Sequence, residues 1–241
     1  MTVRYDTLSV TWLGYATARI ETADGPVVYT DPGRYGVLDN YYARDADVVV
    51  VTHNHHYDSD GIEQVASEDA TIVVYEGVDA SEIDRDVTPV SALPFTVVRV
   101  TDDDHVAVET EHGVVDIWSV PAYNDPDGPC ADADGNVPHP VGLGCGFLIG
   151  LDGHRVFWPG DSDALDGFSE LDVSVFLANI GGSVVSDAAA SAALAEQMQP
   201  ELVIPIHYNT FELLNADAAA FVADVASRSI AVALDERSTN Q

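Results

Sequence analysis

Alternating apolar and polar positions in the first half of the chain predict short β-strands. Leu8–Leu13, Ala16–Thr22 and Pro26–Thr30 have the length of strands, and Ala23-Asp24-Gly25 is a turn signal between the last two. The continuous apolar run Val48–Thr52 is typical of a strand buried on both faces. Further strands are expected at Ile72–Tyr75, Phe95–Val100, Val114–Val120, Cys145–Gly150 and Arg155–Trp158, the last two joined by a turn at Asp152-Gly153.

The second half of the chain alternates strand-like and helix-like segments. Strands are expected at Val173–Leu177, Leu202–Ile206 and Ile230–Leu234. Helices are expected at Gly61–Ser67 with Asp60 as its N-cap, at Asp187–Gln199 before Pro200, and at Ala216–Ser227. Strands mixed with helices predict an α/β (α+β) fold in which helices cover the outside of the sheets.

The length and composition of the chain fit a single domain over residues 1–241. The sequence is 46% hydrophobic, enough to build a substantial core. It contains no run of 18 apolar residues and no secretory signal at the N-terminus, so we expect no membrane partner. Two cysteines, Cys130 and Cys145, do not make a disulfide framework, and this favours the cytoplasm.

The strongly negative charge sets an expectation about the solvent of this protein. The chain has 41 acidic and nine basic residues, and its formal net charge at pH 7 is −32. In dilute buffer such a surface repels itself, whereas at roughly 1 M salt the Debye length falls to about 3 Å. We therefore expect a halophilic protein. An acidic surface for a cationic partner is the alternative, which fits less well because the acidic residues are spread along the whole chain.

A histidine-rich segment directly follows the buried strand Val48–Thr52. It reads His53-Asn54-His55-His56-Tyr57-Asp58. His53 and His55 are two residues apart, so on an extended segment their side chains point to the same face. Two imidazoles on one face can bind one metal ion, so a metal site is the central hypothesis and a hydrolase is the first function to test.

Three more candidate ligands lie near the ends of predicted strands. Asp161 and His207 each follow a strand, and His139 ends a long loop over Pro121–Pro140. Residues just beyond strand ends are carried by a rigid sheet, where functional sites tend to be built. Three imidazoles with an open coordination position suit a hydrolytic zinc, and added carboxylates would permit a second ion.

Six motifs along nearly the whole chain carry a family resemblance. They are Thr11-Trp12-Leu13-Gly14; Tyr29-Thr30-Asp31-Pro32; Val51-Thr52-His53-Asn54-His55; Val120-Pro121-Ala122-Tyr123-Asn124 with His139-Pro140; Gly160-Asp161-Ser162-Asp163; and Ile180-Gly181-Gly182 with Pro205-Ile206-His207-Tyr208-Asn209. In this order they resemble the metallo-β-lactamase superfamily, especially the branch of ascorbate-6-phosphate lactonase and N-acyl phosphatidylethanolamine phospholipase D. One such motif would be weak, whereas six in the right order are a strong signal.

The resemblance implies a fold, a ligand set and a reaction. It implies a four-layer αββα sandwich with the metals at one edge of the two sheets. It implies a first metal held by His53, His55 and His139, and a second held by His207, with Asp161 bridging the two. In the family a metal-bound hydroxide attacks the substrate, because the cation lowers the pKa of bound water toward about 7. Zinc is the expected cofactor, as one or two ions, and manganese or iron also suits these donors.

The chain departs from the family motif HxHxDH beside the histidine pair. The family would place aspartate at position 57 and histidine at position 58, where this chain has Tyr57 and Asp58. Two arrangements stay open. Either Asp58 is an oxygen ligand of the second metal and a catalytic residue beside Asp161, or the loop shifts by one residue, so that Asp58 fills the role of the missing aspartate while His56 turns inward. Asp58 as a helix cap and His56 as a residue outside the ligand set are the plainer interpretations.

Other residues near the motifs have expected supporting roles. Tyr15 is a further departure, because relatives often carry histidine after Trp-Leu-Gly. Asp31 is expected to orient the histidine loop or to fix the Asp-Pro turn, without being a ligand. Tyr123, Asn124 and Tyr208 are near the motifs in sequence and could touch substrate.

Three functions compete on the sequence alone. The leading hypothesis is a metal-dependent hydrolase of a small ester, lactone or phosphodiester, with a small molecule as its partner. The alternative is a degenerate, non-catalytic family member with one structural metal or none, which Tyr57 and Asp58 support. A nuclease ranks last, because nine scattered arginines offer no cationic stripe and we therefore expect no nucleic-acid partner. The oligomeric state, including a homo-oligomer, stays open.

Overall fold

The first of two β-sheets gathers the N-terminal half of the chain. The computed structural model describes residues 2–235, so residues 1 and 236–241 of the expected domain lie outside the description. The strands of this sheet pair in chain order: β1 (Thr2–Tyr5), β2 (Leu8–Gly14), β3 (Thr17–Thr22), β4 (Val27–Thr30), β5 (Ala46–Val51), β6 (Ala66–Tyr75) and β7 (Thr96–Val100). The pairs from β1 to β4 are antiparallel and those from β4 to β7 are parallel. Val48 to Val51 of β5 are at most 1% exposed, as the continuous apolar run predicts for a central parallel strand.

The second sheet is built from the middle and the end of the chain. Its order is β13-β12-β11-β10-β9-β8, with β8 (His105–Thr110), β9 (Gly113–Ala122), β10 (Gly144–Leu151), β11 (His154–Trp158), β12 (Val175–Asn179) and β13 (Leu202–Ile206). The pairs from β8 to β11 are antiparallel, and those from β11 to β13 are parallel. The predicted hairpin of β10 and β11 is confirmed, since Asp152 (φ 48°) and Gly153 (φ 80°) adopt the left-handed conformations of a tight turn.

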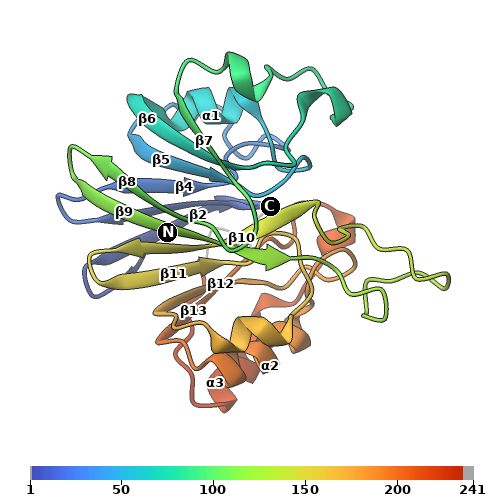
Figure 1. Ribbon diagram of the computed structural model, residues 1–241. Helices are drawn as coiled ribbons and strands as arrows, with labels where there is room; N and C mark the ends of the chain where they lie inside the picture. The colour runs from blue at the N-terminus through green and yellow to red at the C-terminus, as the bar shows by residue number, and fades with distance from the viewer. Residues whose placement is uncertain (1, 236–241) are drawn as a thin grey trace.

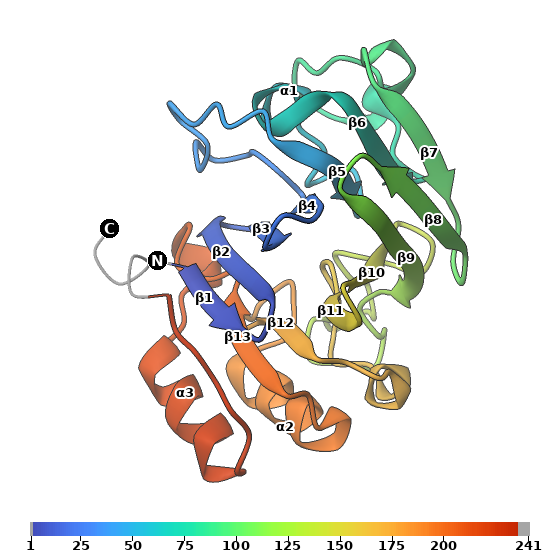
Figure 2. The same cartoon turned by 90° about the vertical axis from the view of Figure 1, so that its left-hand side faces the viewer.

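Helices lie on both outer sides of the paired sheets. In Figure 1, α1 (Ser59–Val65) lies beside β5 and β6, while α2 (Ala188–Met198) and α3 (Ala218–Ser227) lie at the opposite side near β12 and β13. Figure 2 shows the same layers from the side, with α2 and α3 packed together. Short 3-10 turns occur at Ala80–Glu82, Val90–Ala92, Asp166–Glu170 and Glu212–Leu214. Two mixed sheets with few helices confirm the predicted αββα fold class. Within residues 2–235, each helix is too short or too polar to cross a bilayer.

Several predicted elements need correction. The N-cap of α1 is Asp58 and not Asp60, because the extended Asp58 (φ −141°) accepts a hydrogen bond from the Gly61 N–H and the helix starts two residues earlier than expected. Ile230–Leu234 forms no strand; Val232 makes a single β-bridge with Val203 of β13. β1 and β8 were not predicted, because these outer strands keep many exposed polar residues and have little continuous apolar sequence.

The topology brings several loops to one edge of the sandwich. β4 and β5 run in parallel, as do β11, β12 and β13, so the loops that follow these strands start at the same edge of each sheet. The two sheets are joined there by a β-bridge between His53 and Gly144 and by a hydrogen bond from the His207 N–H to the Tyr15 carbonyl (3.1 Å). Residues far apart in sequence therefore meet where the strands end.

Candidate metal centre

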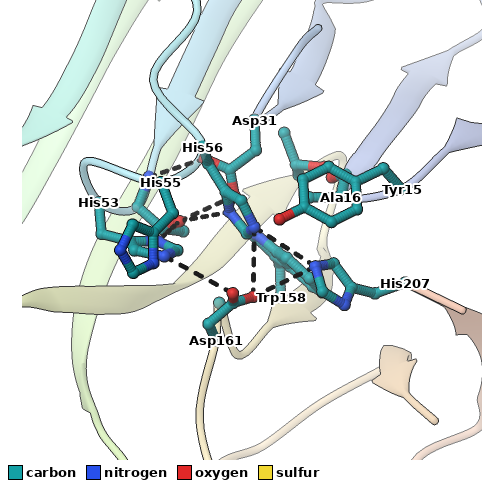
Figure 3. A network of polar contacts seen from close by, with 12 residues as sticks. Tyr15, Ala16, Asp31, His53, His55, His56, Trp158, Asp161 and His207 are labelled. Atoms are coloured by element: carbon teal, nitrogen blue, oxygen red, sulfur yellow. Dashed lines mark hydrogen bonds and ion pairs between the residues drawn. The ribbon is translucent and has the colours of Figure 1, made fainter. Parts of the chain in front are cut away.

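The histidine-rich segment forms a tight turn directly after β5. The backbone N–H groups of His56 and Tyr57 both donate to the His53 carbonyl, at 3.2 and 3.1 Å. This turn brings His53, His55 and His56 close together above the end of β5 (Figure 3). His53 and His56 are buried, and His55 is exposed. The cluster is therefore closed on one side and open to solvent at His55.

Asp161 lies at the centre of the imidazoles, and its two oxygens face different pairs. Oδ2 is 3.3 Å from Nε2 of His139 and 3.6 Å from Nε2 of His53. Oδ1 is 3.2 Å from Nε2 of His56 and 3.3 Å from Nε2 of His207. Asp161 is carried by the loop after β11 and is only 7% exposed. Each oxygen of Asp161 therefore faces its own pair of imidazole nitrogens.

The donor atoms form two overlapping groups with metal-site spacing. Atoms of His53, His55 and His139 all lie within 4.8 Å of one another, and so do atoms of His53, His56 and Asp161. Within the first group, Nδ1 of His55 is 3.1 Å from Nε2 of His139. Nitrogen donors with one carboxylate are the set that zinc prefers in hydrolytic sites.

Asp31 fixes the orientation of His56 from behind. Its carboxylate is 1% exposed and accepts hydrogen bonds from the Thr52 N–H (2.8 Å), the Thr52 hydroxyl (2.9 Å) and the Trp158 indole (2.7 Å). The remaining contact joins Oδ2 of Asp31 to Nδ1 of His56 at 2.9 Å. Nδ1 of His56 therefore carries its proton toward Asp31, and Nε2 faces Asp161. The expectation that Asp31 orients the histidine loop fits this geometry.

His139 is held in the same way by the long loop after β9. Its Nδ1 is 3.1 Å from the side-chain oxygen of Asn124 and 3.0 Å from the Val184 carbonyl. Because both neighbours are acceptors, Nδ1 carries the proton and Nε2 presents a lone pair to the Asp161 carboxylate. A lone pair facing an anion is unfavourable unless a cation lies between them.

Unpaired buried polar atoms in the cluster also indicate that its residues suit a cation. Among residues 2–235, Nε2 of His53, Oδ1 of Asp161 and Nδ1 of His207 have no hydrogen-bond partner. A buried polar atom without a partner costs about 1–3 kcal/mol. A cation would satisfy the first two directly, so the residues present fit a metal ion.

Burial keeps most of the imidazoles neutral. It lowers the pKa of His53 well below its usual value and the pKa of both His55 and His207 to about 4. Burial also lowers the pKa of His139. Neutral imidazole is the form that binds metal ions, so these residues need not lose a proton at neutral pH.

His56 behaves differently because two carboxylates face it. Burial favours its neutral form, but the charges of Asp161 and Asp31 outweigh burial and raise the pKa of His56 to about 10. Burial would raise the pKa of Asp161, yet His56 and the other imidazoles hold it well below the usual range. The two carboxylates thus favour the protonated form of His56. A metal ion bound at Nε2 would take the place of that proton.

Tyr15 closes the far side of the cluster. It is 4% exposed, and its ring lies 4.5 Å from the ring of His207 and 5.0 Å from that of His56, measured between centroids. In Figure 3 it lies next to both imidazoles, on the loop after β2. Its packing fixes the planes of the two rings.

The structure brings together five of the six predicted ligands. His53, His55, His139, Asp161 and His207 meet at one point, although they come from four different loops.

Asp58, the sixth predicted ligand and a predicted catalytic residue, is placed elsewhere. One of its oxygens accepts from the Gly61 N–H (3.0 Å) and the other from the Arg34 N–H (2.9 Å), so the carboxylate caps α1 and holds a neighbouring loop. Tyr57 is also turned away, and its hydroxyl donates to the Thr88 carbonyl. His56 occupies the inward position instead, as the shifted-loop alternative predicts, but Asp58 does not fill the role of the missing aspartate as that alternative also requires. The three histidines within four positions were the available sequence signal for it.

Two glycines allow the loops to approach this closely. A Cβ at Gly160 would lie 2.6 Å from the Cys145 carbonyl, and Gly160 has a left-handed φ of 64° just before Asp161. A Cβ at Gly61 would lie 2.3 Å from the Pro32 carbonyl, where α1 packs on the loop after β4. Any larger residue at either position would displace a loop that carries the cluster.

Comparison with known proteins identifies relatives of this chain that are described as metal-dependent hydrolases. Residues 9–207 match the family described as "Beta-lactamase superfamily domain". The chain is 27% identical to a "UPF0173 metal-dependent hydrolase" of Archaeoglobus fulgidus, over 93% of this chain and 94% of that protein. It is 26% identical to a protein of the same description from Pyrococcus abyssi, over 94% and 96% of the two chains.

Solved structures share the architecture. Igni18, described as a metallo hydrolase from Ignicoccus hospitalis, superposes with a TM-score of 0.68 at 20% identity, over 95% of this chain and 94% of its own. The metallo-β-lactamase fold protein YhfI from Bacillus subtilis superposes with a TM-score of 0.66 at 15% identity, over 95% and 97%. At these identities the likeness shows the fold alone. Because the family match covers most of the chain, the protein belongs to the beta-lactamase superfamily and is a hydrolase of the metallo-β-lactamase fold.

Proposed function

We propose that the protein is a metal-dependent hydrolase of a small ester, lactone or phosphodiester, with two ions, most simply zinc, on either side of Asp161. One observation carries the proposal: Oδ2 of Asp161 faces His139 and His53, while Oδ1 faces His56 and His207, all at 3.2 to 3.6 Å. A carboxylate that only paired with protonated histidines would face imidazolium groups, but among its four imidazole neighbours only His56 has a raised pKa, while the pKa values of His53, His139 and His207 are lowered.

The five imidazoles of the cluster would divide between two metal ions. His53, His55 and His139 would hold the first ion, and His56 and His207 the second, with Asp161 shared. A bound divalent cation supplies two effects: it lowers the pKa of water toward about 7, and it polarises a carbonyl or phosphoryl oxygen.

The residues around the ligands control geometry and charge. Asp31 and the Thr52 hydroxyl orient His56, and Asn124 orients His139, so the donor atoms are in place before any ligand arrives. Five neutral imidazoles and one carboxylate cancel little of the charge of divalent ions. The site would therefore be strongly positive and would stabilise the negative charge that develops on the oxygen under attack.

The degenerate, non-catalytic alternative rested on Tyr57 and Asp58, and it loses this support. Both residues point away from the cluster, but His56 fills the second position, so the departure from the family motif does not leave that position without a ligand. Metal content separates the two functions, because a degenerate protein would hold one ion or none.

The test combines elemental analysis with a hydrolysis screen. Protein purified in molar KCl should contain two ions per chain and should hydrolyse at least one member of a panel of esters, lactones and phosphodiesters. A strong chelator or His55→Ala should abolish this activity. His105→Ala is a matched control, because His105 is an exposed histidine bonded to Asp116 on another part of the second sheet. Hydrolysis that survives the chelator, or a protein with fewer than two bound ions, would refute the proposal.

A further inference from the structure

A cavity opens beside His55, the exposed histidine of the cluster. Its volume is about 460 Å³, within the range of small-molecule pockets. Its wall includes His55 and Asn54 from the histidine loop, Arg34 from the loop after β4, Arg85 from the segment before β7, and Leu143. A molecule bound in this cavity would lie next to the first ligand group.

Two arginines in this wall have spare hydrogen-bond donors. Arg34 donates from Nη1 to the His55 carbonyl (2.9 Å) and from Nη2 to the Tyr35 hydroxyl (2.8 Å). Arg85 uses Nη2 alone, toward the carbonyls of Tyr57 (2.9 Å), Asn54 (3.2 Å) and His55 (3.5 Å). A guanidinium group has five N–H donors, so three on each arginine have no acceptor within the described part of the chain.

Neither of these arginines is held in an ion pair within the described residues, although the protein is very acidic. The chain has 41 acidic and nine basic residues, yet neither Arg34 nor Arg85 forms an ion pair with any residue between 2 and 235. Burial lowers the pKa of Arg85, and the positive charge of Arg34 lowers it further, so the two cations are close enough to repel. An anion between them would remove this repulsion and use the free donors.

The loop that carries Arg34 is held in an unusual conformation. Arg34 (φ 60°) and Tyr35 (φ 52°) are both left-handed, which is unfavourable for residues other than glycine. The Asp58 carboxylate accepts from the Arg34 N–H (2.9 Å), and the guanidinium carbon lies 4.6 Å from the centre of the Tyr35 ring. Asp58 therefore acts as a positioning residue that presents Arg34 to the cavity.

We propose that Arg34 and Arg85 form a clamp for an oxyanion, and that the substrate carries a carboxylate or phosphate group beside the bond that is hydrolysed. The planar guanidinium fork matches both groups by paired hydrogen bonds. Glu82 and Asp84 also line the cavity and repel an anion, so an anion bound there would depend on the donors of the two arginines. Hydrolysis of such a substrate rests on the proposed function, whereas binding of the anion does not.

Calorimetric titration of the full-length, metal-loaded protein in molar KCl tests the clamp. Malonate and inorganic phosphate are the probes, and uncharged malonamide is the ligand control. Arg34→Gln and Arg85→Gln should each weaken binding of the preferred anion at least tenfold, and malonamide should not bind. The tighter of the two anions identifies the group on the substrate.

Arg99→Gln is the matched control for these variants. Arg99 also donates to two backbone carbonyls, those of Glu76 and Val78, but it does not line the cavity. It should keep the wild-type affinity within twofold. Any contribution of bound metal to phosphate binding is the same in all variants whose metal content, measured in parallel, is equal.

Arg34→Lys distinguishes loss of the guanidinium group from a disturbance of the loop that carries residue 34. It keeps the positive charge and loses the fork, so it should bind the anion between the wild type and Arg34→Gln, with an unchanged thermal midpoint. The clamp is refuted if the wild type binds neither anion, if both glutamine variants bind like the wild type, or if Arg99→Gln loses as much affinity as they do. Anion binding without any hydrolysis would count against the proposed function and would still support the clamp.

Discussion

Asp31→Asn is the sharpest test of how the cluster is held together. The Asp31 carboxylate accepts from four donors: the Thr52 N–H and hydroxyl, the Trp158 indole and Nδ1 of His56, at 2.7 to 2.9 Å. An amide of the same shape has only one oxygen. If that oxygen accepts from the Thr52 N–H, the amide NH₂ faces the Trp158 N–H, so two donors face each other. In the opposite orientation the NH₂ faces the Thr52 N–H, which then has no acceptor.

The expected loss of unfolding free energy follows from these contacts. One buried N–H without an acceptor costs about 1–3 kcal/mol, and loss of the charged bond to His56 adds about 1.5–3 kcal/mol. We expect Asp31→Asn to lower the free energy of unfolding by about 2.5–6 kcal/mol. Because His56 also loses its orienting partner, affinity for one of the two ions should fall by about 10–100-fold.

Two measurements check this prediction. Urea unfolding with a chelator present gives the loss of stability without a metal contribution, and urea does not screen the charge of the chain. Equilibrium dialysis against zinc, read by elemental analysis, gives the two affinities. Asp45→Asn is the control, because Asp45 also accepts several hydrogen bonds, from Arg19 and Tyr29, but lies outside the cluster. The reasoning fails if Asp31→Asn binds both ions like the wild type, or if Asp45→Asn weakens one of them equally.

Three further predictions follow from the same structure. His56→Ala should remove one of two ions, since His56 faces only Oδ1 of Asp161, and an unchanged metal content would exclude its assigned role. Asp58→Ala should lower the free energy of unfolding by about 1 kcal/mol through loss of the α1 cap while the metal content stays at two ions; loss of an ion on elemental analysis would restore Asp58 as a ligand. The melting temperature should rise from low to molar KCl, because salt screens repulsion within a chain of net charge −32, and a flat or falling midpoint by differential scanning calorimetry would contradict halophilic adaptation.

The sequence by itself predicted many of the strands and the site residues that follow them. The apolar run Val48–Val51 predicted the buried strand β5, and the motif order predicted that Asp161 and His207 would join the histidines of the loop after it. A buried strand and the residue that follows it can be predicted locally, because a few consecutive positions in the sequence determine both. Parallel pairing then brings such strand ends to one edge.

Tertiary structure alone decided which side chains of the histidine loop turn inward. His56 and Asp58 are both polar and two residues apart, and the sequence allowed either to approach the second position. The choice depends on partners distant in the chain: Asp31 and Asp161 attract His56, while the N–H groups of Arg34 and Gly61 use both oxygens of Asp58. Likewise, no local pattern placed Arg34 and Arg85 beside one another, because their meeting depends on how the loop after β4 packs against the segment before β7.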